Sequence, residues 1–318
     1  MNLIFGNIVD NVTAKKVIKN LDKYILKAKE AQPLNAATVI SACDKLSSKL
    51  SEDDIKLLID MGVPQYKAEQ EFKLLRLMLS KEYLENRLKT ELGTSDTYEY
   101  EEEYKPYGYD VNVRHKFVPL GTLFHISAGN VELLAAFSII EGLLTGNINI
   151  VKLASSDDGL SVMLLKKLID IEPLLKSFIF VFDIASDDMS SLKQISNLSD
   201  ALVVWGSDEA IRAARTFAGI NTRIIEWGHK ISFAYVSYDT KIEDIPDKEL
   251  YSLAYNICDT NQLFCNSCQG ILLDTSDFDE LRTFAKRFLT ILEEVAKSMP
   301  SELDIHITAA KRLELYTE

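Results

Sequence analysis

A short polar loop near residue 265 carries the most reactive side chain in the sequence. Cys265 stands in the stretch Asn-Gln-Leu-Phe-Cys-Asn-Ser-Cys-Gln-Gly, residues 261–270, between a predicted helix and a predicted strand. A thiol with an ordinary pKa of about 8.5 is only a few per cent thiolate at neutral pH, yet it is already strongly nucleophilic. Its thioester keeps a carbonyl that is electrophilic enough to accept a hydride. The loop therefore makes Cys265 a candidate nucleophile.

Cys265 also forms a Cys-x-x-Cys pair with Cys268, and this spacing has other uses. Such a pair can be a redox dithiol or half of a metal site. The sequence has no second pair of suitable spacing, and its histidines are scattered: His115, His125, His229 and His306. A tetrahedral zinc site would need ligands from distant segments, so we predict no metal site. The apolar neighbours of His125 favour a strand residue with a satisfied ring over a base.

Two predicted strand-to-helix turns place hydrogen-bond donors where a ligand could bind. Asn130 precedes the most apolar helix, which it can cap. Alternatively its amide donates to a developing oxyanion, a contact worth about 2.7 to 4 kcal/mol of barrier. Gly206 lets the backbone turn after another strand, and Ser207 can cap a helix whose free amide groups suit a pyrophosphate. Each turn taken alone is more typical of a simple cap, and the usual Gly-x-Gly-x-x-Gly fingerprint is missing.

Hydrophobic spacing predicts the elements that position these groups. Apolar residues at three- and four-residue spacing make residues 14–92 mostly helical, and Pro106 and Gly108 are expected to prevent regular structure between Thr97 and Asp110. Short β-rich runs then alternate with helical ones, which indicates a parallel sheet covered by helices. Strands are predicted at 117–126, 148–153, 178–184, 202–205, 223–225, 231–236 and 271–273. Helices are predicted at 131–145, 160–171, 188–195, 208–217, 248–258 and 278–299.

These elements predict an α/β protein in four parts. A helical N-terminal region covers 1–96, and an exposed connector, with an acidic partner-binding loop as its alternative role, covers 97–116. A Rossmann-like cofactor-binding domain covers 117–230, and a second, partial α/β catalytic domain covers 231–318.

Composition limits the classes of function. A chain of 318 residues with 47% hydrophobic content can bury a sizeable core, and its formal net charge of -13 argues against nucleic acid as a partner. Its four cysteines are too few and too unevenly spaced for a secreted disulfide framework, so we expect reduced thiols in the cytoplasm. The N-terminus does not read as a signal peptide, and no apolar stretch reaches the ~18 residues that suggest a membrane span.

The order of these sites resembles the aldehyde dehydrogenase superfamily, and more closely its LuxC-type fatty-acyl and acyl-CoA reductases. The similarity lies in Pro-Leu-Gly-Thr-Leu-Phe-His-Ile-Ser-Ala-Gly-Asn-Val (119–131), Gly-Leu-Leu-Thr-Gly-Asn (142–147) and Ile-Val-Lys-Leu (150–153). It extends from about Phe117 to the C-terminus. The resemblance implies an aldehyde-dehydrogenase-like fold.

The resemblance also implies roles for individual residues. Asn130 takes the place of the family's oxyanion asparagine, and Lys152 that of the lysine that reaches the adenine ribose or its 2'-phosphate. Gly206 and Ser207 form the turn beside the pyrophosphate, and Cys265 is the nucleophile. An acyl group from CoA or another carrier would pass to Cys265, be reduced by hydride and leave as the aldehyde. The family generally uses NADPH, and NADH remains open.

Glu226 begins Glu-Trp-Gly-His-Lys, which resembles the Glu-Leu-Gly-Gly-Lys segment of hydrolytic aldehyde dehydrogenases, where the glutamate activates water. A reductase gains nothing from hydrolysing its thioester. Glu226 is therefore expected to be either a proton-transfer group or a buried structural carboxylate.

The chain ends 53 residues after Cys265, whereas the family's catalytic domain continues further. By the resemblance, the later part adds a glutamate-bearing segment near the nicotinamide ribose and a strand that helps oligomerisation. We therefore expect a fragment or a shortened protein. A catalytically inactive nucleotide-binding or scaffold relative is the alternative function. The full-length protein is expected to be a homo-oligomer, and an acyl-transferring subunit is a candidate partner.

Overall fold

The chain folds into two compact units, residues 1–228 and 229–318. The computed structural model describes residues 1–30, 33–60, 63, 65–97, 101–129, 133–155, 157, 159–228, 230–238, 241–259, 262 and 265–299. The first unit ends at Gly228, two residues before the predicted end of the cofactor-binding domain at residue 230. The finer division into four parts stays a prediction.

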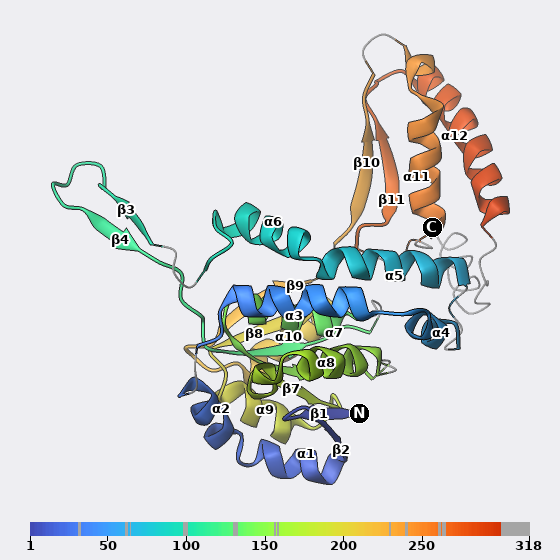
Figure 1. Ribbon diagram of the computed structural model, residues 1–318. Helices are drawn as coiled ribbons and strands as arrows, with labels where there is room; N and C mark the ends of the chain where they lie inside the picture. The colour runs from blue at the N-terminus through green and yellow to red at the C-terminus, as the bar shows by residue number, and fades with distance from the viewer. Residues whose placement is uncertain are drawn as a thin grey trace. The chain divides into compact units, whose positions relative to one another are not determined.

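The first unit is built on a sheet that has seven strands within the described residues, in the order β2-β1-β7-β6-β5-β8-β9 (Figure 1). The five strands from β5 to β9 pair in parallel with one another, and β1 pairs antiparallel with both β2 and β7. The strands are β1 (Asn2–Ile4), β2 (Asn7–Val9), β5 (Thr122–Ile126), β6 (Ile148–Lys152), β7 (Ile179–Phe182), β8 (Ala201–Trp205) and β9 (Arg223–Trp227). The predicted parallel α/β sheet is thus confirmed.

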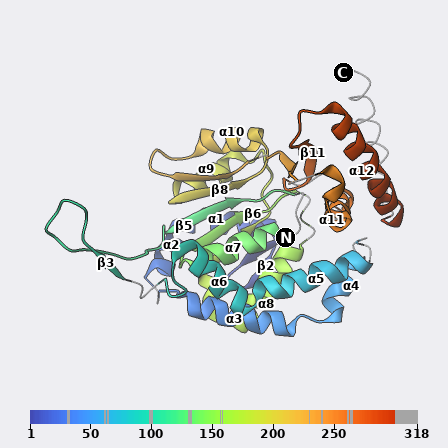
Figure 2. The ribbon, with the colours of Figure 1, turned by 90° about the horizontal axis from the view of Figure 1, so that it is seen from above.

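Helices cover both faces of this sheet because the strand order runs one way from β5 to β7 and the other way from β8 to β9, and right-handed crossovers in opposite directions place their helices on opposite faces. As Figure 2 shows, α7 and α8 lie on one face, and α9 and α10 lie on the other. The inner strands are therefore buried on both sides, and every residue of β6 and β7 is buried. The helices are α7 (Leu134–Leu144), α8 (Leu160–Ile171), α9 (Met189–Asn197) and α10 (Asp208–Phe217), with a 3-10 turn at Pro173–Ser177.

The predicted N-terminal helical layer is confirmed, and it packs over α7 and α8. Helix α3 contacts both of them and is itself covered by α5 and α6. Its N-cap Asn35 accepts a hydrogen bond from the Thr38 amide, which sets where the helix begins. The helices are α1 (Asn11–Ile18), α2 (Leu21–Lys29), α3 (Ala36–Lys49), α4 (Glu52–Asp60), α5 (Gln65–Leu79) and α6 (Lys81–Leu92).

The stretch expected to lack regular structure instead holds a short antiparallel hairpin, so that expectation was wrong. Strand β3 (Glu102–Tyr104) pairs with β4 (Val113–His115), and Arg114 forms an ion pair with Glu103 across it. Pro106 and Gly108, read as breakers of the whole stretch, lie in the connection between the two strands. Gly108 has a φ of 83°, a conformation that glycine adopts without strain.

The second unit contains a parallel strand pair and two helices. Strands β10 (Ser232–Val236) and β11 (Cys268–Leu273) pair in parallel. The helices α11 (Asp247–Asp259) and α12 (Phe278–Ser298) pack together, and a 3-10 turn (Ile242–Asp244) precedes α11. Their apolar faces form a small separate core that includes Phe284 and Phe288. The predicted strands and helices of this region are confirmed.

No helix among the described residues is both long and apolar enough to cross a membrane.

Candidate active site

The first unit has a natural ligand site at the carboxyl ends of its parallel strands. The chain runs from β5 outward through β6 to β7, then returns across the sheet to β8 and continues to β9. The order therefore reverses between β5 and β8. Open α/β sheets bind ligands in the crevice outside the strand ends at such a switch point. Lys152, which ends β6, and Gly206, which follows β8, stand on either side of β5 at this edge.

Lys152 is a buried cation at this edge. Its side chain is only 6% exposed, and Nζ donates a hydrogen bond to Ser186 Oγ at 2.9 Å. Burial lowers the pKa of this lysine because the charged form loses hydration, and the nearby Asp183 carboxylate partly opposes the shift. Asp183 also pairs with the N-terminal ammonium of Met1 at 2.8 Å, so it neutralises the Lys152 charge only in part. The Lys152 ammonium is therefore suited to an anionic ligand.

The Gly206–Ser207 turn joins β8 to α10. Gly206 has a φ of 153°, and a Cβ at this position would lie 3.0 Å from the Cβ of Ala210, so the tight turn requires glycine. Ser207 Oγ accepts a hydrogen bond from the Ala210 amide at 3.4 Å and caps the helix, as predicted. The first turn also carries the carboxylates Asp208 and Glu209, which already meet part of the positive helix end.

Glu226 lies on the α10 face of the edge strand β9. Its two carboxylate oxygens accept hydrogen bonds from Arg215 at 2.7 and 3.0 Å. This hydrogen bond to Arg215 lowers the pKa of Glu226. The residue is exposed, so it is an ion-paired surface carboxylate and not a buried one.

Asn130 lies outside the described residues, and its predicted role as an oxyanion donor stays a prediction. The residues before it are described. The Ser127 amide donates to the carbonyl oxygen of Lys152 at 3.2 Å, which ties the segment after β5 to the end of β6.

Cys265 lies in the second unit, in the turn before β11. The residue is exposed, and its thiol is free. Ser232 Oγ donates to the Cys265 carbonyl oxygen at 2.6 Å, which fixes the backbone of the turn against the start of β10. Cys268 is 5% exposed, and its thiol donates to the Gly270 carbonyl oxygen at 3.2 Å. The two cysteines of the Cys-x-x-Cys pair are therefore unequal, since one is accessible and the other is part of the core.

A metal site is one of the two alternative uses of this pair. In the part of the chain that is described, no group of three or more His, Cys, Asp or Glu side chains could hold a metal ion.

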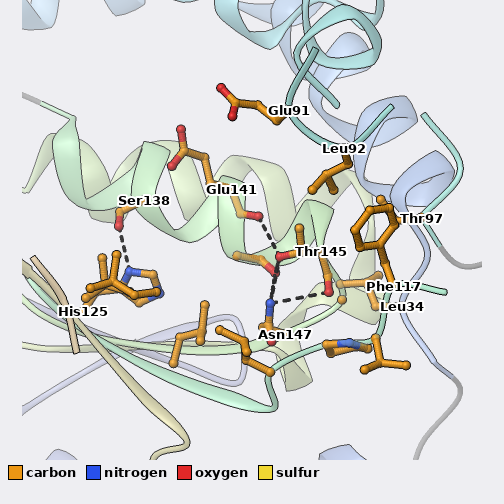
Figure 3. A pocket seen from close by; sticks show the side chains of 18 of the residues that line it. Leu34, Glu91, Leu92, Thr97, Phe117, His125, Ser138, Glu141, Thr145 and Asn147 are labelled. Carbon is orange, nitrogen blue, oxygen red and sulfur yellow. Dashed lines mark hydrogen bonds between the residues drawn. The ribbon is translucent and has the colours of Figure 1, made fainter. Parts of the chain in front are cut away.

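A cavity of about 530 Å³ in the first unit was not predicted from the sequence. Figure 3 shows that α7 forms one wall, with Leu92 and Phe117 on the opposite side. Its floor is the α7 face of β5, β8 and β9, and Trp227 lines it at the carboxyl end of β9. In the sequence the apolar residues of this floor look like ordinary core positions of separate strands. Only the register of the sheet brings them together.

A chain of hydrogen bonds runs beneath this cavity. Asn149 Nδ2 donates to the Asn147 carbonyl oxygen, so its Oδ1 must accept from His125 Nε2, at 3.0 Å. His125 Nδ1 is then an acceptor, and the Ser138 hydroxyl donates to it at 2.7 Å (Figure 3). Ser138 Oγ in turn accepts from Trp205 Nε1 at 3.1 Å. The predicted satisfied ring of His125 is confirmed, and its neutral tautomer is defined by its partners.

The indole of Trp205 also stacks on that of Trp227, with ring centroids 4.9 Å apart and 9° between the planes. The hydrogen-bond chain therefore fixes an aromatic pair at the carboxyl end of β8 and β9.

The buried ring makes the stability of the first unit depend on pH. Burial lowers the pKa of His125 from 6.5 to about 4, because the charged ring would lose its hydration. Above pH 6.5 the ring is neutral in both the folded and the unfolded protein, and its burial does not oppose folding. As the pH falls from 6.5 to about 4, the unfolded chain binds a proton that the folded protein does not, and roughly 3 kcal/mol of stability should be lost progressively. Urea unfolding followed by tryptophan fluorescence should show it, since both tryptophans belong to the first unit.

The matched control for this slope is His125→Gln, which cannot titrate. The variant should be less stable at pH 7, and its stability should change less between pH 6.5 and 4 than that of the wild type. An equal pH dependence in the two proteins would exclude His125 as its source.

Comparison with known proteins agrees with this arrangement. The family model for acyl-CoA reductase (LuxC) matches residues 31–314. A long-chain acyl-protein thioester reductase from Photobacterium phosphoreum is 32% identical over 223 residues, which cover 68% of this chain and 44% of the relative. The corresponding protein from Vibrio harveyi is 28% identical over 263 residues, covering 81% and 53%. The chain thus spans about half the length of the curated relatives it matches.

Solved structures show the same fold. An NAD-dependent benzaldehyde dehydrogenase from Corynebacterium glutamicum has a TM-score of 0.65 at 16% identity, covering 90% of this chain and 59% of that one. Aldehyde dehydrogenase 21 from Physcomitrella patens has a TM-score of 0.66 at 16% identity, covering 87% and 56%. A glyceraldehyde-3-phosphate dehydrogenase from Methanocaldococcus jannaschii, solved with NADP, has a TM-score of 0.63 at 19% identity, covering 88% and 59%. The fold is that of the aldehyde dehydrogenases, and the chain belongs to the LuxC family of acyl-CoA reductases.

Proposed function

We propose that this protein reduces an activated fatty acyl group to the aldehyde, with Cys265 as the acyl carrier and NADPH as the reductant. The observation that carries the proposal is the ligand edge of the sheet, where the Lys152 ammonium and the Gly206–Ser207 turn flank the switch point. Membership of the LuxC family supports the acyl substrate.

The residues at this edge fit a dinucleotide phosphate. Lys152 offers a buried positive charge beside the Ser186 hydroxyl, which suits a ribose or its 2'-phosphate. The close turn at Gly206 allows a pyrophosphate to approach the backbone at the start of α10. NADPH, when bound, supplies the hydride. NADH is the alternative reductant, since it lacks only the phosphate that Lys152 would meet.

The proposed chemistry at Cys265 begins with acyl transfer. The Cys265 thiol loses its proton, and the thiolate attacks the carbonyl carbon of the substrate thioester to form a new carbon–sulfur bond. The bond from that carbon to the carrier sulfur breaks, and the carrier leaves as a thiol after taking up one proton in place of the one that Cys265 lost. The Asn130 amide would donate a hydrogen bond to the oxyanion that develops in this step. After reduction of the new thioester, the carbon–Sγ bond of the thiohemiacetal breaks. This releases the aldehyde and restores the cysteine.

Glu226 is proposed only as a proton-transfer group. Its ion pair with Arg215 and lowered pKa keep it a carboxylate at neutral pH, so it would accept a proton rather than donate one.

The acyl donor is proposed to be an acyl protein or acyl-CoA, since the relatives are named acyl-protein thioester reductases and the family is described as acyl-CoA reductases. A cytoplasmic location is proposed because all four cysteines are free thiols. The homo-oligomer and the acyl-transferring subunit stay predictions.

Product analysis tests the function directly. The 318-residue chain, supplied with dodecanoyl-CoA and NADPH, should form dodecanal with one NADPH oxidised per aldehyde. Gas chromatography of the aldehyde and absorbance at the NADPH band measure the two quantities. Binding of NADPH without acyl transfer would instead favour an inactive nucleotide-binding relative.

A further inference from the structure

The floor of the 530 Å³ cavity follows the rows of the sheet. His125, Val203 and Ile225 are direct cross-strand neighbours and form one row across β5, β8 and β9. Leu123 lies two residues closer to the amino end of β5, and Trp227 lies two residues closer to the carboxyl end of β9. From the row of Leu123 to that of Trp227 the strands advance four residues, about 13 Å. The floor is therefore long in the strand direction and apolar except for His125.

The uncharged polar side chains that line the cavity are bonded within the protein. His125 and Ser138 bond to each other, as described above. Asn147 Nδ2 donates to Thr145 Oγ1 at 2.7 Å (Figure 3). Asn147 Oδ1 accepts from the Gly121 amide at 2.9 Å. Since these groups already have partners, a polar ligand would gain little from them and would lose its hydration. The cavity therefore favours an apolar occupant.

Charge at the cavity excludes one kind of apolar chain. Glu91 and Glu141 line it, and both carry carboxyl groups. Glu141 pairs with Arg87, whereas the described residues that line the cavity include no lysine or arginine. A fatty acid carboxylate entering here would meet carboxylates of the same sign, while a thioester, aldehyde or alcohol would not.

One end of the cavity adjoins the proposed cofactor turn through the backbone. The Gly206 amide donates to the Trp227 carbonyl oxygen at 3.3 Å, and Trp227 lines the cavity. A chain lying on the floor with its reactive end beside Trp227 would present that end at the carboxyl edge of the sheet.

We propose that this cavity binds the alkyl chain of the acyl substrate, along α7 and over the row of His125, Val203 and Ile225. The identity of this chain as part of the substrate rests on the proposed function, whereas the binding of an uncharged alkyl chain does not. The chain fills mainly apolar space whose uncharged polar side chains are already bonded within the protein, and burial of its methylene groups provides the affinity.

Tryptophan fluorescence provides a direct test, because the two tryptophans of the sequence form the stacked pair at one end of the cavity. Bromododecanol is an uncharged chain whose heavy atom quenches nearby indoles. It should quench the 318-residue chain saturably, and dodecanol should compete better than dodecanoate. Ile225→Phe adds bulk to the floor and should weaken binding by about tenfold or more.

Two further variants control the test. Ile220→Phe makes the same change at a fully exposed position outside the cavity and should bind like the wild type. Leu120→Glu places a charge at a half-exposed lining position that tolerates polarity, and it should weaken binding even if Ile225→Phe folds poorly. Circular dichroism checks folding of all three variants.

The outcomes separate this inference from the proposed function. Absence of saturable quenching in the wild type, or equal binding by all the variants, would overturn the cavity assignment. If the cavity is correct and reduction occurs, Ile225→Phe should lower kcat/KM for a dodecanoyl thioester far more than for a butanoyl thioester. Equal losses for the two would also overturn it. Binding that persists in a Cys265→Ala protein, without any reduction by the wild type, would support the cavity and count against the reductase.

Discussion

Replacing Cys265 by alanine is expected to abolish both covalent acyl labelling and acyl-thioester-dependent NADPH oxidation. The thiol is exposed in a turn held by Ser232, and the proposed chemistry has no other acyl carrier. Removal of an essential nucleophile leaves only residual catalysis, so the rate should fall at least about 1000-fold. Mass spectrometry after incubation with an acyl thioester measures the acyl group bound to the protein, and NADPH absorbance measures turnover.

Two other cysteines provide the controls for this result. Cys258→Ala changes a half-buried thiol in α11 and should keep both activities. Cys268→Ala removes a buried thiol that donates to the Gly270 carbonyl oxygen, and it tests the dithiol alternative. That alternative predicts a reversible Cys265–Cys268 disulfide and loss of function in both variants. Full turnover by the Cys265→Ala protein would end the thioester mechanism.

Replacing Lys152 by methionine is expected to weaken NADPH binding by about 10- to 100-fold, with little effect on NADH. Methionine keeps most of the unbranched apolar stem but lacks the buried ammonium group, and a hydrogen bond to a charged group contributes about 1.5 to 3 kcal/mol. Only NADPH carries the 2'-phosphate that this charge would meet. Fluorescence titration of each nucleotide measures the two dissociation constants.

The same lysine predicts a pH effect with a definite sign. Burial lowers its pKa, so the ammonium form of the free protein is lost at a lower pH than that of an ordinary lysine. NADPH affinity should therefore begin to fall with rising pH below the usual lysine range, and Lys152→Met should remove this dependence.

Lys166 supplies the matched control for Lys152. It pairs with Asp170 on the surface of α8, and Lys166→Met should leave both nucleotides unaffected. An equal loss of NADPH and NADH affinity in Lys152→Met would mean that the lysine supports the fold of the edge and not the phosphate.

Local sequence signals predicted much of the fold because they act over a few residues. The bounds of α8 and α10 agree with the prediction to the residue, since Ser207 caps α10 and the apolar spacing of α8 is regular. The β1–β2 hairpin was missed because it is held by pairing with β7, which is nearly 180 residues away in the sequence. The β3–β4 hairpin was missed because its strands are exposed and lack an apolar face.

Part of the candidate site could also be predicted from local sequence signals, and part of it could not. Lys152, Gly206 and Ser207 follow predicted strands, so their shared edge could be inferred from the alternation of strands and helices. The cavity could not be inferred, because Leu123, Val203 and Ile225 meet only through the register of β5, β8 and β9. An apolar residue in a buried strand gives no sign of whether a helix or a ligand covers it.

The hydrogen-bond chain from Asn149 through His125 and Ser138 to Trp205 has an evolutionary consequence. Loss of one member leaves its buried neighbours unsatisfied, whereas exchanging the set for apolar residues of similar shape is nearly neutral. Substitutions at these four positions should therefore be inherited together across the family, and a lineage with leucine in place of His125 should also lack the polar groups at 138 and 149.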